Sequence, residues 1–143
     1  MDKNYHALIQ DRIFMCGADD VQSVVNNENV KVVVDLREEA NHCAAVGKGL
    51  KWINISLVDD PSDSGEIHLT EAIEAVTTAY NQGEKVVFHC GGGKGRTGMV
   101  AYGTLMKLGF AQSLDEAEEQ AKSIRPILNI KPTQRLALEK LFE

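Results

Sequence analysis

The chain has 143 residues and a formal net charge of −6 at pH 7, with 43% hydrophobic and 25% charged residues. This length predicts a single domain over residues 1–143, large enough to bury a hydrophobic core without disulfides or metal. The negative charge argues against nucleic acid or an anionic membrane as a bulk partner.

Localisation is predicted from what the sequence lacks. No apolar run approaches the roughly 20 residues that cross a bilayer, so we expect no transmembrane segment. The three cysteines, Cys16, Cys43 and Cys90, have no zinc-site spacing. Their odd number and the missing signal peptide favour a reducing cytoplasm.

Apolar runs, turn residues and helix caps predict strands that alternate with helices along the chain. Strands are expected over residues 12–16, 31–36, 51–57 and 85–89. Helices are expected over residues 19–27, 70–83, 97–108, 113–124 and 133–142. Residues 37–49 read as a polar, partly helical connection, and residues 58–66 as a loop rich in Asp, Ser, Pro and Gly.

This alternation predicts an α/β fold, a three-layer sandwich with a central, mainly parallel sheet flanked by helices. Ligands of such sheets bind at the carboxyl ends of the strands. Cys90 and the loop that follows Leu57 both lie at such ends. We therefore expect the aspartate-rich loop on the same side of the sheet as Cys90.

The most informative stretch runs from the apolar strand at Val86 through Cys90 to the start of a helix near Thr97, with four glycines within six positions. Glycines let backbone N–H groups surround an anion, and the helix N-terminus adds positive potential. A cysteine there is favoured as the thiolate, which is the nucleophilic form. Arg96 offers a planar fork for two phosphate oxygens, and Thr97 can donate a hydrogen bond to the Cys90 sulfur.

The string His-Cys-x5-Arg-Thr-Gly resembles the signature of the cysteine-dependent protein tyrosine phosphatases, specifically their small dual-specificity branch. The resemblance covers about residues 30–138 and implies a phosphomonoester hydrolase that acts on phosphorylated proteins or peptides through a phosphocysteine. It implies Cys90, Arg96 and Thr97 as catalytic residues and no metal or organic cofactor. The phosphate would be bound by Gly91, Gly92, Gly93, Lys94, Gly95 and Arg96.

Expulsion of an alkoxide or phenoxide requires a proton, which a carboxylic acid usually supplies. The loop after Leu57 offers three candidates. Asp59 best matches the general acid of the family, at a similar spacing before the cysteine; Asp60 is the second candidate and Asp63 the third.

Two further stretches resemble the phosphoinositide 3-phosphatases of the tumour-suppressor type. In Gly-Lys-Gly-Arg-Thr-Gly, Lys94 matches a lysine that serves multiply phosphorylated inositol rings, but Gly91 replaces a second lysine. Pro132-Thr133-Gln134-Arg135 resembles their Pro-Ser-Gln-Arg stretch. Gln134 then either helps to place the hydrolytic water or is a solvent-facing residue of a first helical turn. A phosphoinositide phosphatase is therefore the alternative within the enzymes.

Other readings stay open from the residues alone. A non-catalytic phosphate-binding module and a rhodanese-like sulfur transferase are the alternatives of other classes. Arg37 either meets an anionic substrate or, as the favoured alternative, forms a structural ion pair with a neighbouring carboxylate. Cys43 is either an unpaired thiol or a partner that rescues an oxidised Cys90. The remaining histidines are expected at the surface, and the first 30 residues show no catalytic motif.

Overall fold

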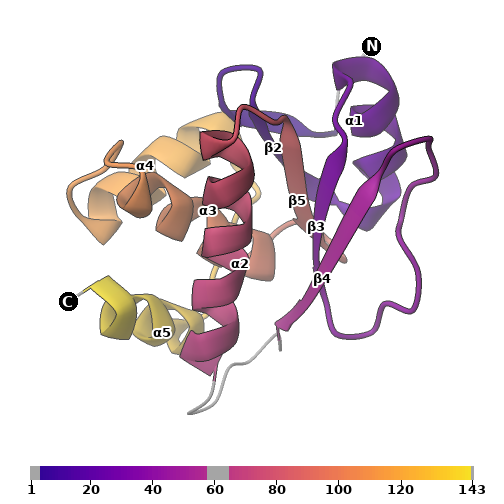
Figure 1. The fold of residues 1–143 in the computed structure, drawn as a ribbon. Helices are drawn as coiled ribbons and strands as arrows, with labels where there is room; N and C mark the ends of the chain where they lie inside the picture. The colour runs from indigo at the N-terminus through magenta and orange to yellow at the C-terminus, as the bar shows by residue number, and fades with distance from the viewer. Residues whose placement is uncertain (1–3, 58–64, 143) are drawn as a thin grey trace.

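The computed structural model of the chain describes residues 4–57 and 65–142. These residues form a five-stranded sheet with helices on both faces (Figure 1). The strands are β1 (His6–Ile9), β2 (Ile13–Gly17), β3 (Val32–Arg37), β4 (Lys51–Leu57) and β5 (Val86–Cys90). The helices are the 3-10 turn η1 (Ala18–Asp20), α1 (Val21–Glu28), α2 (Gly65–Asn81), α3 (Gly95–Lys107), α4 (Leu114–Ile124) and α5 (Pro132–Phe142).

The strand order is β1-β2-β5-β3-β4. β5 pairs in parallel with β2 and β3, and β3 pairs in parallel with β4, whereas β1 is antiparallel to β2. The predicted α/β fold with a mainly parallel sheet is therefore confirmed. The register aligns Cys90 with Gly17 of β2, and His89 with Asp35 of β3. Because the carboxyl ends of these strands meet at one edge, their following segments converge around Cys90.

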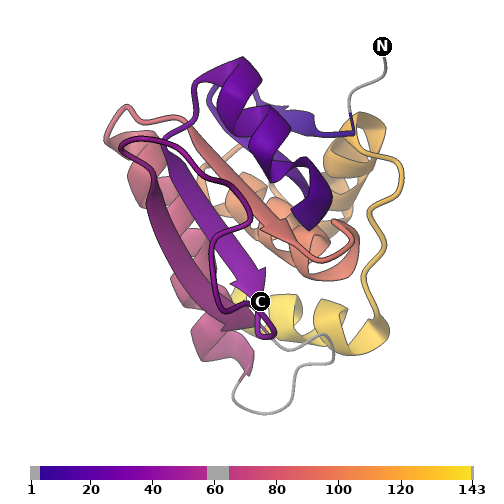
Figure 2. The ribbon, with the colours of Figure 1, turned by 90° about the vertical axis from the view of Figure 1, so that its right-hand side faces the viewer.

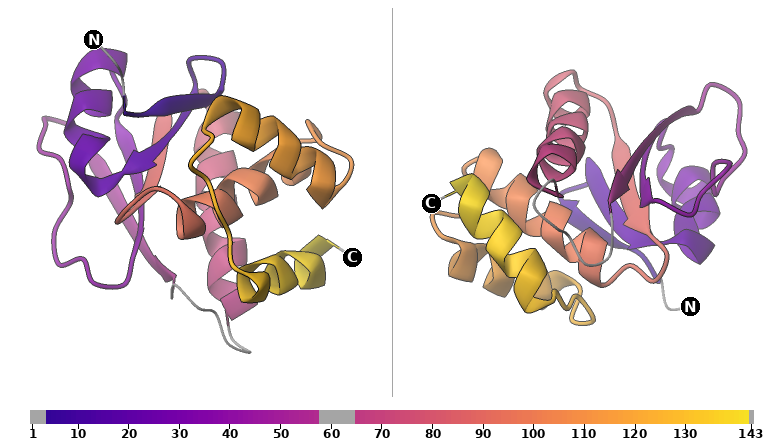
Figure 3. Two further views of the ribbon diagram at one scale, coloured as in Figure 1. Left: turned by 180° about the vertical axis from the view of Figure 1, so that it is seen from behind. Right: turned by 90° about the horizontal axis from the view of Figure 1, so that it is seen from below.

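Two hydrophobic clusters attach the helices to the sheet. α1 and part of the β3–β4 connection cover one face, where Val21, Val24 and Ala45 pack against the strands (Figure 2). The other helices lie on the opposite side, around Phe88 of β5 and Tyr102 of α3 (Figure 1). Seen from below, a short loop leads from the end of β5 to α3, and α5 lies alongside α3 (Figure 3).

Several predicted boundaries need correction. The segment over residues 38–50 contains no helix; it runs in bends, and Cys43, Ala44 and Ala45 pack against the α1 cluster instead. α2 begins at Gly65, five residues before the predicted start, because the buried Leu69 extends its apolar face backwards.

β1 was not predicted, since its short sequence gives a weak periodic signal. The tight connection to β2 requires a left-handed backbone at Gln10.

The expected cap of α4 is present, because the Ser113 side chain accepts a hydrogen bond from the Glu116 N–H.

Candidate active site

The segment from Cys90 to Arg96, here called the phosphate loop, connects the end of β5 to the first turn of α3. The Cys90 side chain lies under the loop and is almost fully buried. Its Sγ accepts hydrogen bonds from the Gly93 N–H at 3.2 Å and from the Thr97 hydroxyl at 3.1 Å. Two hydrogen-bond donors and the N-terminus of α3 therefore surround this one sulfur.

Two glycines allow the loop to close this tightly. Gly93 has a positive φ of 71°, and a Cβ built on it would lie 2.5 Å from Arg125 Nη2 and 2.6 Å from the Gly17 nitrogen. A Cβ on Gly17 would in turn lie 2.9 Å from the Gly91 carbonyl oxygen. That carbonyl accepts a hydrogen bond of 3.0 Å from the Ala18 N–H. The end of β2 therefore fixes the path of the loop, and no side chain fits at these contacts.

Arg96 is the second residue of α3, and its guanidinium lies at the open side of the loop. Nη1 and Nη2 donate to the two carboxylate oxygens of Glu39, at 3.0 and 3.3 Å, and Nη1 also lies 3.4 Å from the Leu57 carbonyl. The hydrogen bonds from Arg96 lower the pKa of Glu39 below its ordinary value. No sequence pattern indicated Glu39, which lies 57 positions before Arg96 in a polar segment. The fork of Arg96 is thus already oriented by a bidentate carboxylate.

Arg125 approaches the loop from the other side and is nearly buried, at 2% exposure. Its Nε donates to the Gly93 carbonyl at 2.9 Å, and its Nη1 donates to the Asn4 carbonyl and to His6 Nδ1, both at 2.9 Å. Burial lowers the pKa of Arg125 and also that of His6. In the sequence analysis Arg125 only marks the end of a helix. The prediction that His6 lies at the surface is wrong, because its ring is half-buried and hydrogen-bonded to Arg125.

A polar cluster lies behind Cys90. His89 is fully buried, with Nδ1 3.1 Å from the Cys90 carbonyl and Nε2 3.7 Å from Asp35 Oδ1. Burial lowers the pKa of His89. Burial of Asp35 opposes its ionisation, but hydrogen bonds from Arg37 and Trp52 and the charge of His89 outweigh this, so its pKa is lowered. Arg37 donates to both Asp35 oxygens, which confirms its structural ion pair.

The remaining predicted residues have varied outcomes. Asp59, Asp60 and Asp63 lie outside the described residues, so their assignment as the acid stays a prediction. Gln134 is fully buried and accepts a hydrogen bond of 2.8 Å from the Lys131 N–H, so the solvent-facing alternative is wrong. Lys94 is exposed on the loop.

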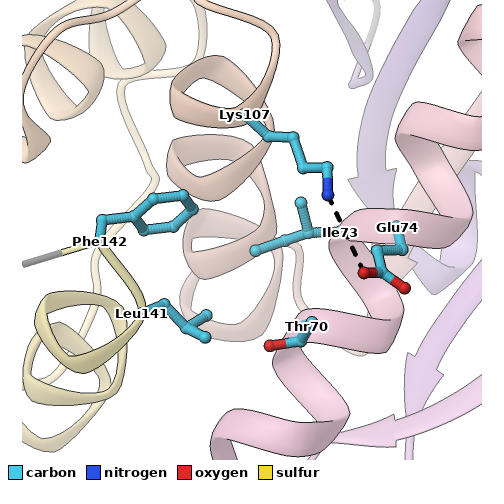
Figure 4. A pocket seen from close by; sticks show the side chains of 6 residues that line it. All are labelled: Thr70, Ile73, Glu74, Lys107, Leu141 and Phe142. Atoms are coloured by element: carbon cyan, nitrogen blue, oxygen red, sulfur yellow. Dashed lines mark ion pairs between the residues drawn. The ribbon is translucent and has the colours of Figure 1, made fainter.

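A hollow of about 160 Å³ between α2, α3 and α5 is remote from this chemistry. Figure 4 shows Lys107 and Glu74 facing each other across it, with Nζ and Oε1 3.9 Å apart. Lys107 ends α3, about 17 Å along the helix from Arg96 at 1.5 Å per residue. This hollow therefore belongs to the helical packing rather than to the phosphate loop.

Residues 13–140 match the catalytic domain of the dual specificity phosphatases. The chain belongs to this family and is a cysteine-based phosphatase. No curated protein sequence matches it significantly.

Solved structures share the fold over nearly the whole chain. A mouse dual specificity phosphatase crystallised with zinc tungstate superposes with a TM-score of 0.84 at 20% identity, covering 99% of this chain and 88% of its own. Human DUSP28 gives 0.80 at 19% identity, covering 99% and 95%. PTPMT1 gives 0.78 at 22% identity, covering 96% and 93%. At these identities the likeness establishes the fold.

Residues 4–57 and 65–142 contain neither a membrane-spanning helix nor a metal-binding cluster. None of the helices there has the length and apolar character needed to cross a membrane. No group of three or more His, Cys, Asp or Glu side chains in those ranges is arranged to hold a metal ion.

Proposed function

We propose that this chain is a protein tyrosine or dual-specificity phosphatase in which Cys90 is the nucleophile, Arg96 and the loop N–H groups bind the phosphoryl oxygens, and Asp59 is the general acid. The observation that carries the proposal is the pair of hydrogen bonds to Cys90 Sγ, from the Gly93 N–H and the Thr97 hydroxyl. Donors aimed at a sulfur stabilise it as an attacking thiolate and again as a leaving group.

The reaction proceeds in two steps. Cys90 Sγ bonds to phosphorus while the bond to the substrate oxygen breaks, and that oxygen takes a proton from Asp59. Asp59 then accepts a proton from a water molecule, whose oxygen bonds to phosphorus as the S–P bond breaks. The electron pair returns to the sulfur, where the Thr97 hydroxyl stabilises it. Arg96 and the loop amides supply the positive charge that phosphoryl transfer needs.

A phosphoinositide substrate is the second candidate, because Lys94 is exposed on the loop. PTPMT1, one of the structural neighbours, has been crystallised with PI(5)P. Lys94 is, however, the only lysine in the phosphate loop, and the chain carries a net charge of −6. A polyanionic headgroup gains little from one lysine, so we favour phosphoprotein substrates.

A substrate panel distinguishes the candidates. Phosphotyrosyl and phosphothreonyl peptides, phosphoinositides and para-nitrophenyl phosphate are compared for the wild type, Lys94→Ala and the remote control Lys107→Ala. We expect turnover of peptides and equal, small effects of Lys94→Ala on all substrates. A loss confined to phosphoinositides would instead identify a lipid phosphatase. Thiosulfate turnover would identify a sulfur transferase, and binding without turnover a non-catalytic module.

The acid is tested through the pH dependence of kcat/KM. Asp59→Asn should flatten the alkaline limb and slow alkyl phosphates strongly, while activated aryl phosphates lose less because their leaving groups need no proton. Asp60→Asn should leave the profile nearly unchanged. The reverse pattern would make Asp60 the acid, and an unchanged alkaline limb in both variants would point to Asp63.

A further inference from the structure

A second hollow, here called the flanking pocket, adjoins the phosphate loop. It has a volume of about 440 Å³ and is lined by the loop residue Gly92 and by residues from both ends of the chain. These are Asn4, His6, Asp20, Arg125, Pro126 and Ile127. An extended peptide advances about 3.4 Å per residue, so a residue close in sequence to a phosphorylated one can reach this pocket.

The flanking pocket is lined by one arginine, Arg125, and one carboxylate, Asp20. Arg125 lines it, but this guanidinium is 98% buried and already donates to Gly93, Asn4 and His6. Asp20 is half-buried at the start of α1, and within residues 4–57 and 65–142 its carboxylate makes no hydrogen bond or ion pair. Its neighbour Asp19 is exposed. The charge of Asp20 interacts with the charge of Arg125, but no donor within residues 4–57 and 65–142 contacts the carboxylate, so a cation that enters the pocket would give Asp20 a hydrogen-bonding partner.

The opposite wall is apolar. Pro126 and Ile127 follow α4, and Ile127 is 49% exposed although it is a large hydrophobic residue. A lysine or arginine side chain has an apolar stem and a charged head, so it can cover such a wall while its head meets a carboxylate. Glutamate, phosphoserine and purely apolar side chains each match only part of these surroundings.

We propose that the flanking pocket binds a lysine or arginine side chain of the substrate, next to the phosphorylated residue, with Asp20 as the group that selects it. This inference rests on the proposed function and narrows it to phosphoproteins with a basic residue beside the phosphorylated one. A half-exposed ion pair contributes a fraction of a kcal/mol up to about 1 kcal/mol, which predicts a two- to fivefold preference.

The test uses phosphotyrosyl peptides that are neutral apart from one lysine, placed in turn at each flanking position. Each is paired with a peptide carrying norleucine instead, which has a similar stem and no charge. The readout is the ratio of kcat/KM between the two peptides, which cancels any general effect of a substitution. Asp11→Asn is the matched control, because it removes the same charge at the far end of β2, between Ile9 and Ile13.

We expect the wild type to prefer lysine about two- to fivefold at one or two positions, Asp11→Asn to keep this preference and Asp20→Asn to lose it. Asp20→Lys should reverse it in favour of a glutamate peptide. Equal rates for lysine and norleucine, or a preference that survives in Asp20→Asn, would overturn the inference while leaving the phosphatase intact. A wild-type preference for acidic or doubly phosphorylated peptides would overturn it in favour of Arg125. Absence of turnover for every peptide would overturn the proposed function as well.

Discussion

The two sides of the phosphate loop each hold an arginine, and the two arginines are held differently. The Arg96 side chain is 11% exposed, and its carboxylate partner Glu39 is 56% exposed. Arg125 is buried and donates to two backbone carbonyls and to His6. A carboxylate at the surface can share its arginine with an arriving phosphate, whereas buried carbonyls cannot exchange partners without unfolding the loop. One side is therefore suited to binding and the other to support.

The largest expected effect is on the binding side. Arg96→Lys keeps the charge but loses the planar fork, so we expect kcat for para-nitrophenyl phosphate to fall by several orders of magnitude, with stability nearly unchanged. Steady-state kinetics and urea unfolding measure the two quantities. A loss of less than about tenfold, or about 1.4 kcal/mol, would mean that Arg96 does not hold the transition state.

On the supporting side the effect should appear in stability. Arg125→Met leaves the Gly93 and Asn4 carbonyls without their donor, which should cost about 2–4 kcal/mol in the free energy of unfolding. The Gly93 N–H then points less accurately at Cys90, so kcat should fall too. Arg96→Met is the matched control, with an expected cost within about 1 kcal/mol. Equal losses for both variants would remove the distinction between the two sides.

The support behind the loop also predicts how stability depends on pH. Burial lowers the pKa of His89 and His6, so the unfolded chain takes up protons below about pH 6.5 that the folded chain does not, and stability falls. The pKa of Asp35 is lowered as well, so a further loss follows as the pH falls below about 4. Urea unfolding between about pH 7 and about pH 2 measures both losses. Replacing both His89 and His6 with Asn should remove the loss of stability that begins below about pH 6.5. If that loss persists in the double variant, other groups cause it.

The smallest effect is expected for Glu39→Gln. Weakening the bidentate contact loosens the orientation of Arg96, so kcat/KM should fall severalfold but by less than tenfold, with little change in stability. The exposed neighbour Glu38 provides the control, Glu38→Gln. An increase in kcat/KM would show that Glu39 competes with phosphate instead of orienting the arginine.

What could be predicted from the sequence follows from how local each feature is. The phosphate loop is contiguous from strand to helix, so residue types alone indicated that Thr97 could reach the sulfur of Cys90. The Ser113 cap and the Arg37–Asp35 pair are equally local. These features depend on neighbours within a few positions, which a sequence pattern displays directly.

Glu39 and Arg125 could not be found in this way. Glu39 contacts a residue 57 positions away, and Arg125 contacts one 32 positions away. The fold brings each of them to the phosphate loop, but the sequence around either residue shows no periodic pattern that would indicate this contact. The prediction of a partly helical connection over residues 37–49 is wrong for a related reason, because Ala44 and Ala45 pack against α1 in an irregular path that only tertiary contacts specify.

The central claim is that Cys90 carries the phosphoryl group during turnover. Thr97→Ala removes the hydroxyl that stabilises the departing sulfur, so the intermediate should accumulate in this variant. Acid quenching during turnover of para-nitrophenyl phosphate, followed by mass spectrometry of the digested protein, locates the group. We predict a phosphorylated peptide with the modification on Cys90, and its absence in Thr97→Ala/Cys90→Ser. A phosphoryl group on another residue, or undiminished turnover by Cys90→Ser, would contradict the account.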